Sequence, residues 1–322
     1  MGPASRLARV LLVAVAICLV ATSGATEGRQ PHRASRCTAQ ATLTCEELVA
    51  LGYAYPYARE PGPYLFVNGA AYPYVDPLTE PLMQAPVQVG SAVITTAKLL
   101  ESLGLAKHVL RARTPVIGYG SNAAVSALTR KYVDPRVGEP AVIPVTRARL
   151  RDYDVVWSPH LVFNGAMPAT IVPSPGTVVE VWITWLDDRE LARMHETEGA
   201  GAVYAYGTLA PARLDSDVAL PGPAHVYVDC AGGLVLDGAL RAIAAVPAAG
   251  RRFPALDSEH AMQGVAPLIG WTGSVFALLL DNVRSPGRSA ERTQTLAVLG
   301  RILGDANYHV DCPCGAESCP VP

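Results

Sequence analysis

The sequence has few charged residues and no block of basic ones. Charged residues make up 17% of the 322-residue chain, and its 26 Lys and Arg are scattered among 28 Asp and Glu. A nucleic-acid groove or an anionic-membrane surface requires clustered Lys and Arg. The composition therefore argues against nucleic acid and against a membrane surface as partners.

Two motifs of common enzymes and metalloproteins are also missing. The chain has no Gly-x-Ser-x-Gly nucleophile elbow, so a hydrolase that pairs a serine with His160, His195 or His225 is the weakest alternative. The cluster of Cys312, Cys314 and Cys319 lacks the paired two-residue spacing of zinc ribbons. We therefore expect no metal here, and we expect these cysteines to form disulfides.

The first 25 residues have the pattern of a secretory signal peptide. Arg6 and Arg9 precede the apolar run Val10 to Ala21, and the small residues Ser23 to Ala25 follow. We expect cleavage after Ala25, a secreted or periplasmic protein, and no membrane contact beyond the signal peptide. An uncleaved anchor is the alternative.

Outside this segment the chain has an even number of cysteines, which favours disulfides in an exported protein. These cysteines are Cys37, Cys45, Cys230, Cys312, Cys314 and Cys319. Cys37 and Cys45 can form a local bridge, but the rest of the connectivity cannot be deduced from the sequence. The oligomeric state is likewise undetermined.

Half of the residues are hydrophobic, enough to bury a core in one large domain or two small ones. Residues 26–86 are rich in Pro and Tyr, and we interpret them as an extended arm; an aromatic binding surface is the alternative. The main domain is expected at 87–304, with its core at 114–230. A Cys-rich tail follows at 305–322.

Short strand-like segments dominate the core. They lie at 145–150, 153–157, 169–172, 178–185, 202–209 and 225–230. In the clearest of them Val179, Val181 and Ile183 alternate with polar or aromatic residues. Because these strands follow one another through short turns, they predict an α+β fold rather than a doubly wound sheet.

Helices are expected within 91–111, 234–245 and 290–303. The uncharged run Ala261 to Leu280 is long enough to span a membrane. Its glycines, its proline and its polar residues instead favour a loop that leads into a buried helix at 275–280.

The stretch Thr114 to Leu128 reads as strand, tight loop and helix. Gly118 and Gly120 permit a tight turn, and Ser121 or Asn122 can cap the helix that follows. Such a loop directs free backbone N–H groups at one point, where they can bind a phosphate or a carboxylate. The alternative is a simple turn before a capped helix.

The best-marked helix spans Asp187 to Glu198. Asp187 and Glu190 form a capping box, and Gly199 ends the helix. On the helical period Glu198 shares a face with the apolar Leu191 and Met194. Burial on that face would suit Glu198 to proton transfer; the alternative is a helix-end glutamate that reaches solvent or pairs with a basic residue.

Together these motifs resemble the gamma-glutamylcyclotransferase-like family. The resemblance rests on Tyr119-Gly-Ser-Asn122, on the strand Ala148 to Val155, on Ala169 to Ile171 and Ser174 to Gly176, and on Glu198 before Gly199. It implies an α+β fold, a small mixed β-barrel or sheet flanked by helices, here with N- and C-terminal extensions. The resemblance covers about a third of the chain.

The resemblance also implies an activity: a gamma-glutamyl amide is converted into 5-oxoproline and a free amine without cofactor or metal. Gly118, Tyr119, Gly120, Ser121 and Asn122 would bind the gamma-glutamyl head of this small-molecule substrate. Glu198 would be the catalytic acid and base. The alternative within this fold is a binding module that captures a small anionic ligand without turnover.

The chain also departs from the family pattern. The family has a tyrosine-bearing segment late in the fold that contacts substrate, and the nearest counterpart here is Ser258-Glu-His260, with histidine in place of tyrosine.

Overall fold

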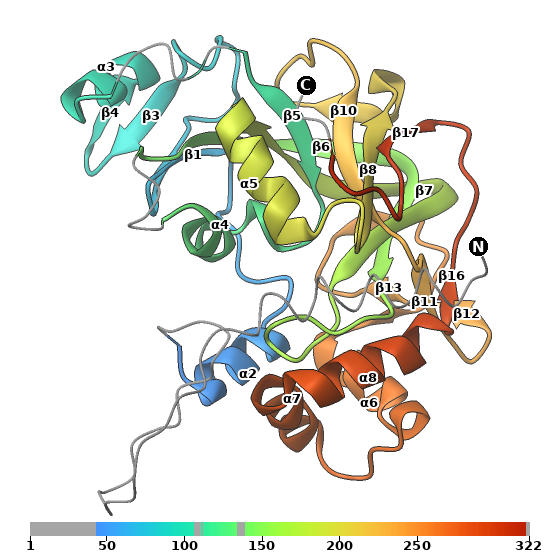
Figure 1. The fold of residues 1–322 in the computed structure, drawn as a ribbon. Helices are drawn as coiled ribbons and strands as arrows, with labels where there is room; N and C mark the ends of the chain where they lie inside the picture. Colours follow the sequence, from blue (N-terminus) through green and yellow to red (C-terminus); the bar gives the residue numbers. More distant parts are fainter. Residues whose placement is uncertain (1–42, 106–109, 111, 134–138, 320–322) are drawn as a thin grey trace, which may run out of the picture.

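The computed structural model describes residues 43–105, 110, 112–133 and 139–319 (Figure 1). The predicted signal peptide and Cys37 lie outside the described residues. None of the described helices is long and apolar enough to cross a membrane, including those within Ala261 to Leu280.

Twelve of the described strands form one mixed sheet, in the central order β15-β13-β6-β7-β5-β10-β8-β17, with β1, β2, β9 and β14 attached at its sides. The strands are β1 (Tyr64–Val67), β2 (Ala70–Pro73), β5 (Thr114–Gly118), β6 (Val142–Trp157), β7 (Ala169–Leu186), β8 (Tyr204–Leu209), β9 (Leu214–Ser216), β10 (Ala224–Asp229), β13 (Ala242–Ile243), β14 (Ala248–Ala249), β15 (Ala255–Leu256) and β17 (Tyr308–Cys312).

Two long antiparallel strands, β6 and β7, form the centre of this sheet. The predicted strands 145–150 and 153–157 are two halves of β6. They are separated by an irregularity at Asp152, whose φ is +64°. The predicted strands 169–172 and 178–185 both lie within β7. The local strand pattern was therefore right, but each pair of segments is one continuous strand.

The pairing between β5 and β10 is parallel, whereas β5 pairs antiparallel with β7. The predicted α+β class with a mixed sheet is therefore confirmed. Among the described strands β15 and β17 end the central order and do not pair with each other, so the closed barrel named in the same prediction is not seen.

Seven helices are described. Figure 1 shows four of them grouped at one end of the molecule, α2, α6, α7 and α8, whereas α4 and α5 lie side by side near β5. The helices are α2 (Cys45–Tyr53), α3 (Thr96–Ser102), α4 (Val125–Tyr132), α5 (Asp188–Glu198), α6 (Ser258–Val265), α7 (Val275–Arg284) and α8 (Pro286–Ala297). The 3-10 turns are η2 (Ser121–Ala123), η3 (Pro211–Arg213) and η4 (Pro267–Ile269).

Two small sheets complete the fold. One is the hairpin of β3 (Pro86–Val89) and β4 (Ala92–Thr95), and the other contains β11 (Gly233–Leu236), β12 (Ala239–Leu240) and β16 (Gly300–Arg301). Two helix predictions are corrected here. Residues 91–111 begin with β4 before α3, and residues 234–245 form β11, β12 and β13 rather than a helix. In the second case Asp237 and Gly238 both have positive φ and make a hairpin turn.

The described part of the predicted arm, residues 43–86, is built into the fold. The apolar β1 is fully buried and pairs along its length with β6. The helix α2 packs against α7 from the other end of the chain. Burial of this apolar strand accounts for its place in the main sheet.

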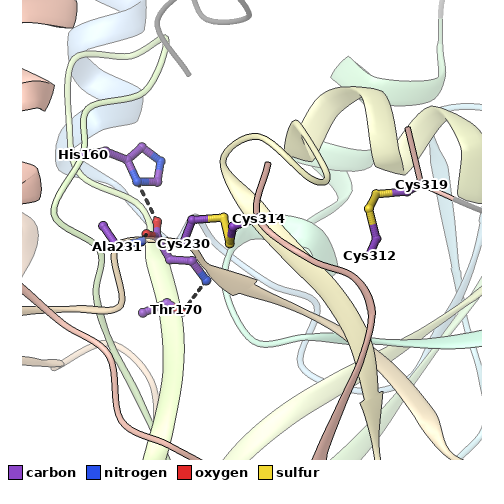
Figure 2. Close-up of a disulfide and its surroundings, with 8 residues drawn as sticks. His160, Thr170, Cys230, Ala231, Cys312, Cys314 and Cys319 are labelled. Carbon is purple, nitrogen blue, oxygen red and sulfur yellow. Dashed lines mark hydrogen bonds and ion pairs between the residues drawn. A yellow bond between two sulfur atoms is a disulfide. The ribbon is translucent and has the colours of Figure 1, made fainter. Parts of the chain in front are cut away.

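Disulfides secure the C-terminal tail. Cys230 is bonded to Cys314, and Cys312 to Cys319. Figure 2 shows the Cys230–Cys314 bond in the neighbourhood of His160 and Thr170. Cys45 is also disulfide-bonded. These bonds confirm the disulfide prediction and are typical of an oxidising compartment outside the cytoplasm.

Candidate active site

The predicted loop follows β5, an interior strand of the main sheet, which pairs with β7 on one side and β10 on the other. The chain leaves the sheet at Gly118 and makes a 3-10 turn, Ser121–Ala123, before α4 begins at Val125. Ala124 is the N-cap of α4 and makes no side-chain hydrogen bond. The prediction that Ser121 or Asn122 caps this helix was therefore wrong, because the 3-10 turn separates them from it.

Backbone amides are available at this turn. In the described part of the chain, no hydrogen-bond acceptor is found for the N–H groups of Ser121 and Asn122. The amide of Ala124 is used within the turn, since it donates to the Ser121 carbonyl over 2.9 Å. Free amides beside a cavity are suited to an anionic group.

Gly120 is held in a tight place. A Cβ atom on this residue would lie 2.6 Å from the Tyr55 hydroxyl and 3.3 Å from the Ala169 Cβ atom. The Tyr55 hydroxyl accepts a hydrogen bond of 2.9 Å from the Ala169 amide. A glycine is therefore required by close packing, and the loop rests directly on Tyr55.

The helix α5 brings Glu198 to the same place. Its N-terminal capping box, Asp187 with Glu190, is present as predicted, and Gly199 ends the helix with a left-handed φ of 60°. The Glu198 side chain is only 16% exposed. The ammonium group of Lys131, on the neighbouring α4, donates a hydrogen bond to Glu198 Oε1. Glu198 is thus turned inward, as expected of a proton-transfer residue, and it is also paired with a basic residue, as the alternative interpretation stated.

The loop and Glu198 line one cavity of about 30 Å³. Its walls are Tyr55, Ile117, Tyr119, Gly120, Ser121, Asn122, Ala169, Glu198, Tyr204 and Tyr227. Such a volume holds two or three water-sized groups, about the size of one carboxylate. Gly118 lies at the end of β5, just before the lining residue Tyr119.

Four tyrosines form most of the remaining wall, and their hydroxyl groups are engaged. Tyr119 donates to the Tyr227 carbonyl over 2.7 Å, and Tyr204 donates to the Ala169 carbonyl over 3.1 Å. Burial raises the pKa of Tyr55, Tyr119, Tyr204 and Tyr227 above the ordinary tyrosine range. They stay neutral near pH 7, and Glu198 is the one carboxylic acid among the described residues of this wall.

Three histidines named from the sequence lie around the site. Nδ1 of the buried His195, on α5, lies 2.8 Å from the Tyr227 hydroxyl. His160 pairs with Asp229 over 2.7 Å. Nδ1 of His225 lies 3.9 Å from an Asp311 oxygen. Each therefore has a polar neighbour other than serine, as expected of structural histidines.

The segment Ser258 to His260 does not line the cavity. It begins α6, where the Ser258 hydroxyl donates to the Gly52 carbonyl over 2.7 Å. The His260 side chain is exposed and pairs with Asp257. Instead, the tyrosine supplied from a distant part of the chain is Tyr55.

Four residues of the site were not predicted from the sequence: Lys131, Tyr55, Tyr204 and Tyr227. Lys131 lies on the helix just after the loop, so a basic residue at that position was the one available signal. Tyr204 and Tyr227 lie on strands that were predicted, but their direction depends on sheet register. Tyr55 lies within residues 26–86, and the alternative interpretation of that segment as an aromatic binding surface did not single out this tyrosine.

Within the residues that the structure describes, no group of three or more His, Cys, Asp or Glu side chains is placed to hold a metal ion. Comparisons with protein-family models, curated proteins and solved structures gave no match to this chain.

Proposed function

We propose that the protein is an exported gamma-glutamyl amide cyclotransferase that releases 5-oxoproline and a free amine. The observation that carries the proposal is the shared cavity: free loop amides line it together with a single, largely buried glutamate. The resemblance of the loop and of the Glu198-Gly199 helix end to the gamma-glutamylcyclotransferase-like family supports the same reading.

The proposed chemistry needs one proton carrier. The loop amides of Gly120, Ser121 and Asn122 hold the α-carboxylate of the substrate, and Glu198 takes a proton from its α-ammonium group. The free amine then attacks the γ-carbonyl carbon, and a new C–N bond closes the five-membered ring. Glu198 returns the proton to the leaving nitrogen as the original amide bond breaks, and the second proton that the attacking nitrogen loses on ring closure leaves with the amine, which departs as an ammonium ion.

Cyclisation is intramolecular, so confining the head in a small cavity supplies much of the rate acceleration. The engaged and neutral tyrosines supply shape and exclude water without competing for the proton. Because the reaction consumes no water and no redox equivalent, this chain's own residues suffice for it.

The direct test is release of 5-oxoproline from a panel of gamma-glutamyl amino acids. Replacing Glu198 by Gln keeps the size of the side chain but removes the base, so we expect a loss of about a hundredfold or more in kcat. Glu196→Gln is the matched control, since Glu196 lies on the exposed side of the same helix and pairs with Arg193. Undiminished turnover in Glu198→Gln would exclude Glu198 as the base.

A second candidate function is a binding module without turnover, and the Lys131–Glu198 pair favours it. A substrate ammonium would have to compete with Lys131 for the carboxylate. Burial lowers the pKa of Lys131, while the charge of Glu198 and its hydrogen bond raise it. Calorimetric binding of gamma-glutamyl compounds, with no 5-oxoproline formed after long incubation, would support this function instead.

A further inference from the structure

Arg59, before β1 in the described part of the chain, contacts the loop. Arg59 Nη2 donates to the carbonyl oxygens of both Tyr119 and Gly120, each over 2.9 Å. The residues it joins are 60 and 61 positions apart in the sequence. Arg59 lies four residues after Tyr55, whose hydroxyl packs closely against Gly120.

These two hydrogen bonds fix the direction of two peptide groups. In a trans peptide the C=O and the N–H point to opposite sides. Holding the Tyr119 and Gly120 carbonyls toward Arg59 therefore turns the N–H groups of Gly120 and Ser121 to the other side of the loop. Gly120 and Ser121 also line the cavity, so this orientation presents their amides to a bound group.

Arg59 also brings positive charge close to the loop. Among the described residues it forms no ion pair with a carboxylate, and its buried Nε has no hydrogen-bond partner. Burial lowers the pKa of Arg59, but an arginine remains charged at neutral pH. Glu180 attracts this cation but forms no ion pair with it, so positive charge remains behind the amides and favours an anion in front of them.

We propose that Arg59 is a positioning residue that orients the Gly120 and Ser121 amides toward the carboxylate of the bound head group. The identity of that head group rests on the proposed function. The preference of the loop for a carboxylate does not rest on the proposed function, because it depends only on the oriented amides and on the positive charge of Arg59.

The test compares two ligands that differ only in the carboxylate: 5-oxoproline and 2-pyrrolidinone. Their binding to the full chain is followed by calorimetry and by the amide NMR signals of Gly120 and Ser121. In the wild-type protein we expect those signals to shift with 5-oxoproline, and affinity for it at least about tenfold above that for 2-pyrrolidinone, equivalent to one strong charge-assisted contact.

Arg59→Met should reduce this preference to about twofold or less, and Arg59→Lys should restore part of it, since lysine keeps the charge. Arg130→Met is the matched control. Arg130 stacks on Tyr57 of the same N-terminal segment, with its guanidinium 4.7 Å from the ring centre, and makes no hydrogen bond to the loop carbonyls. The Arg130→Met variant should retain the wild-type preference for 5-oxoproline over 2-pyrrolidinone.

The outcomes separate this inference from the proposed function. An unchanged carboxylate preference in Arg59→Met, or wild-type amide signals that do not move with 5-oxoproline, would overturn the role of Arg59. The protein could instead bind 5-oxoproline selectively, lose this selectivity in Arg59→Met, and form no 5-oxoproline from any substrate. That result would support the role of Arg59 and contradict the proposed enzymatic function.

Discussion

At the scale of single residues, Gly120 is where the loop has least room. An alanine Cβ would lie 2.6 Å from the Tyr55 hydroxyl, a distance at which one of the two groups must move. We expect Gly120→Ala to lower the free energy of unfolding by roughly 1–3 kcal/mol, the usual cost of overpacking, and to weaken ligand binding. Chemical denaturation and calorimetry with 5-oxoproline measure the two effects.

The Tyr55→Phe substitution provides the control. It removes the hydroxyl that a new methyl group would meet, at the cost of the hydrogen bond from the Ala169 amide. Neighbouring changes of this kind are not additive, so the double variant should be less destabilised than the sum of the two single variants. Strict additivity would mean that the Tyr55 hydroxyl is not what restricts Gly120.

The sequence could predict Glu198 and the loop because each depends on local signals. The direction of Glu198 follows from helical periodicity and from the caps that fix the ends of α5. The partner of Glu198 could not be predicted, since it depends on how α4 packs against α5. Arg59 was equally out of reach, because its hydrogen bonds join segments whose proximity only the folded sheet determines.

At the scale of secondary-structure elements, too, local signals were predictable and long-range packing was not. The alternation in 178–185 predicted strand, and the structure agrees. The apolar stretch 234–245 was misjudged because short apolar runs fit a helix or a strand equally well. The pair Asp237-Gly238 carried the missing information, since it is a hairpin turn signal between two apolar segments.

The pairing of β8, β10 and β17 encloses a titratable group whose effect on stability can be measured. His225 on β10 stacks on Tyr206 of β8, with ring centres 5.0 Å apart. Burial lowers the pKa of His225, Asp311 on β17 raises it, and His195 lowers it further. The balance places its pKa below the ordinary value of about 6.5.

A lowered histidine pKa means that the unfolded chain takes up the proton more readily than the folded one. The stability contributed by neutral His225 is therefore present above about pH 6.5 and is lost as the pH falls through the folded-state pKa. His225→Phe keeps an aromatic ring but cannot titrate, so its free energy of unfolding should fall less between pH 7.5 and pH 5. The free energies of unfolding are measured by denaturant unfolding at each pH. If they change with pH by the same amount in both proteins, His225 has the same pKa in the folded and the unfolded state.

At the scale of the whole molecule, the two ends of the chain complete the central sheet and the site. Residues before β5 supply β1, Tyr55 and Arg59, whereas β17 pairs with β8 at one end of the central strand order. The interpretation of residues 26–86 as an arm followed from their Pro-rich composition. Composition does not reveal that an apolar segment such as β1 finds its partner in β6, because that pairing is non-local.

The C-terminal tail is attached to the site by more than its strand. The Gly315 amide donates to the Gly201 carbonyl over 2.6 Å, just beyond the Gly199 that ends α5. The Cys230–Cys314 disulfide lies one residue away and joins the end of β10 to this tail. We therefore expect that releasing the C-terminal tail would change the position of Glu198.

The two described disulfides differ in the length of chain that each encloses. Cys230 and Cys314 are 84 positions apart, whereas Cys312 and Cys319 are 7 apart. In the chain-entropy model, replacing the first pair by serines should cost about 4–5 kcal/mol of unfolding free energy, and replacing the second about 2 kcal/mol. Denaturant unfolding of the two double-serine variants measures both losses.

Because the Cys230–Cys314 bond also holds the tail against the turn after α5, its loss should reduce ligand binding at the cavity under conditions where the chain is still folded. Equal losses in the two variants would mean that local geometry, rather than loop length, sets the contribution of each bond.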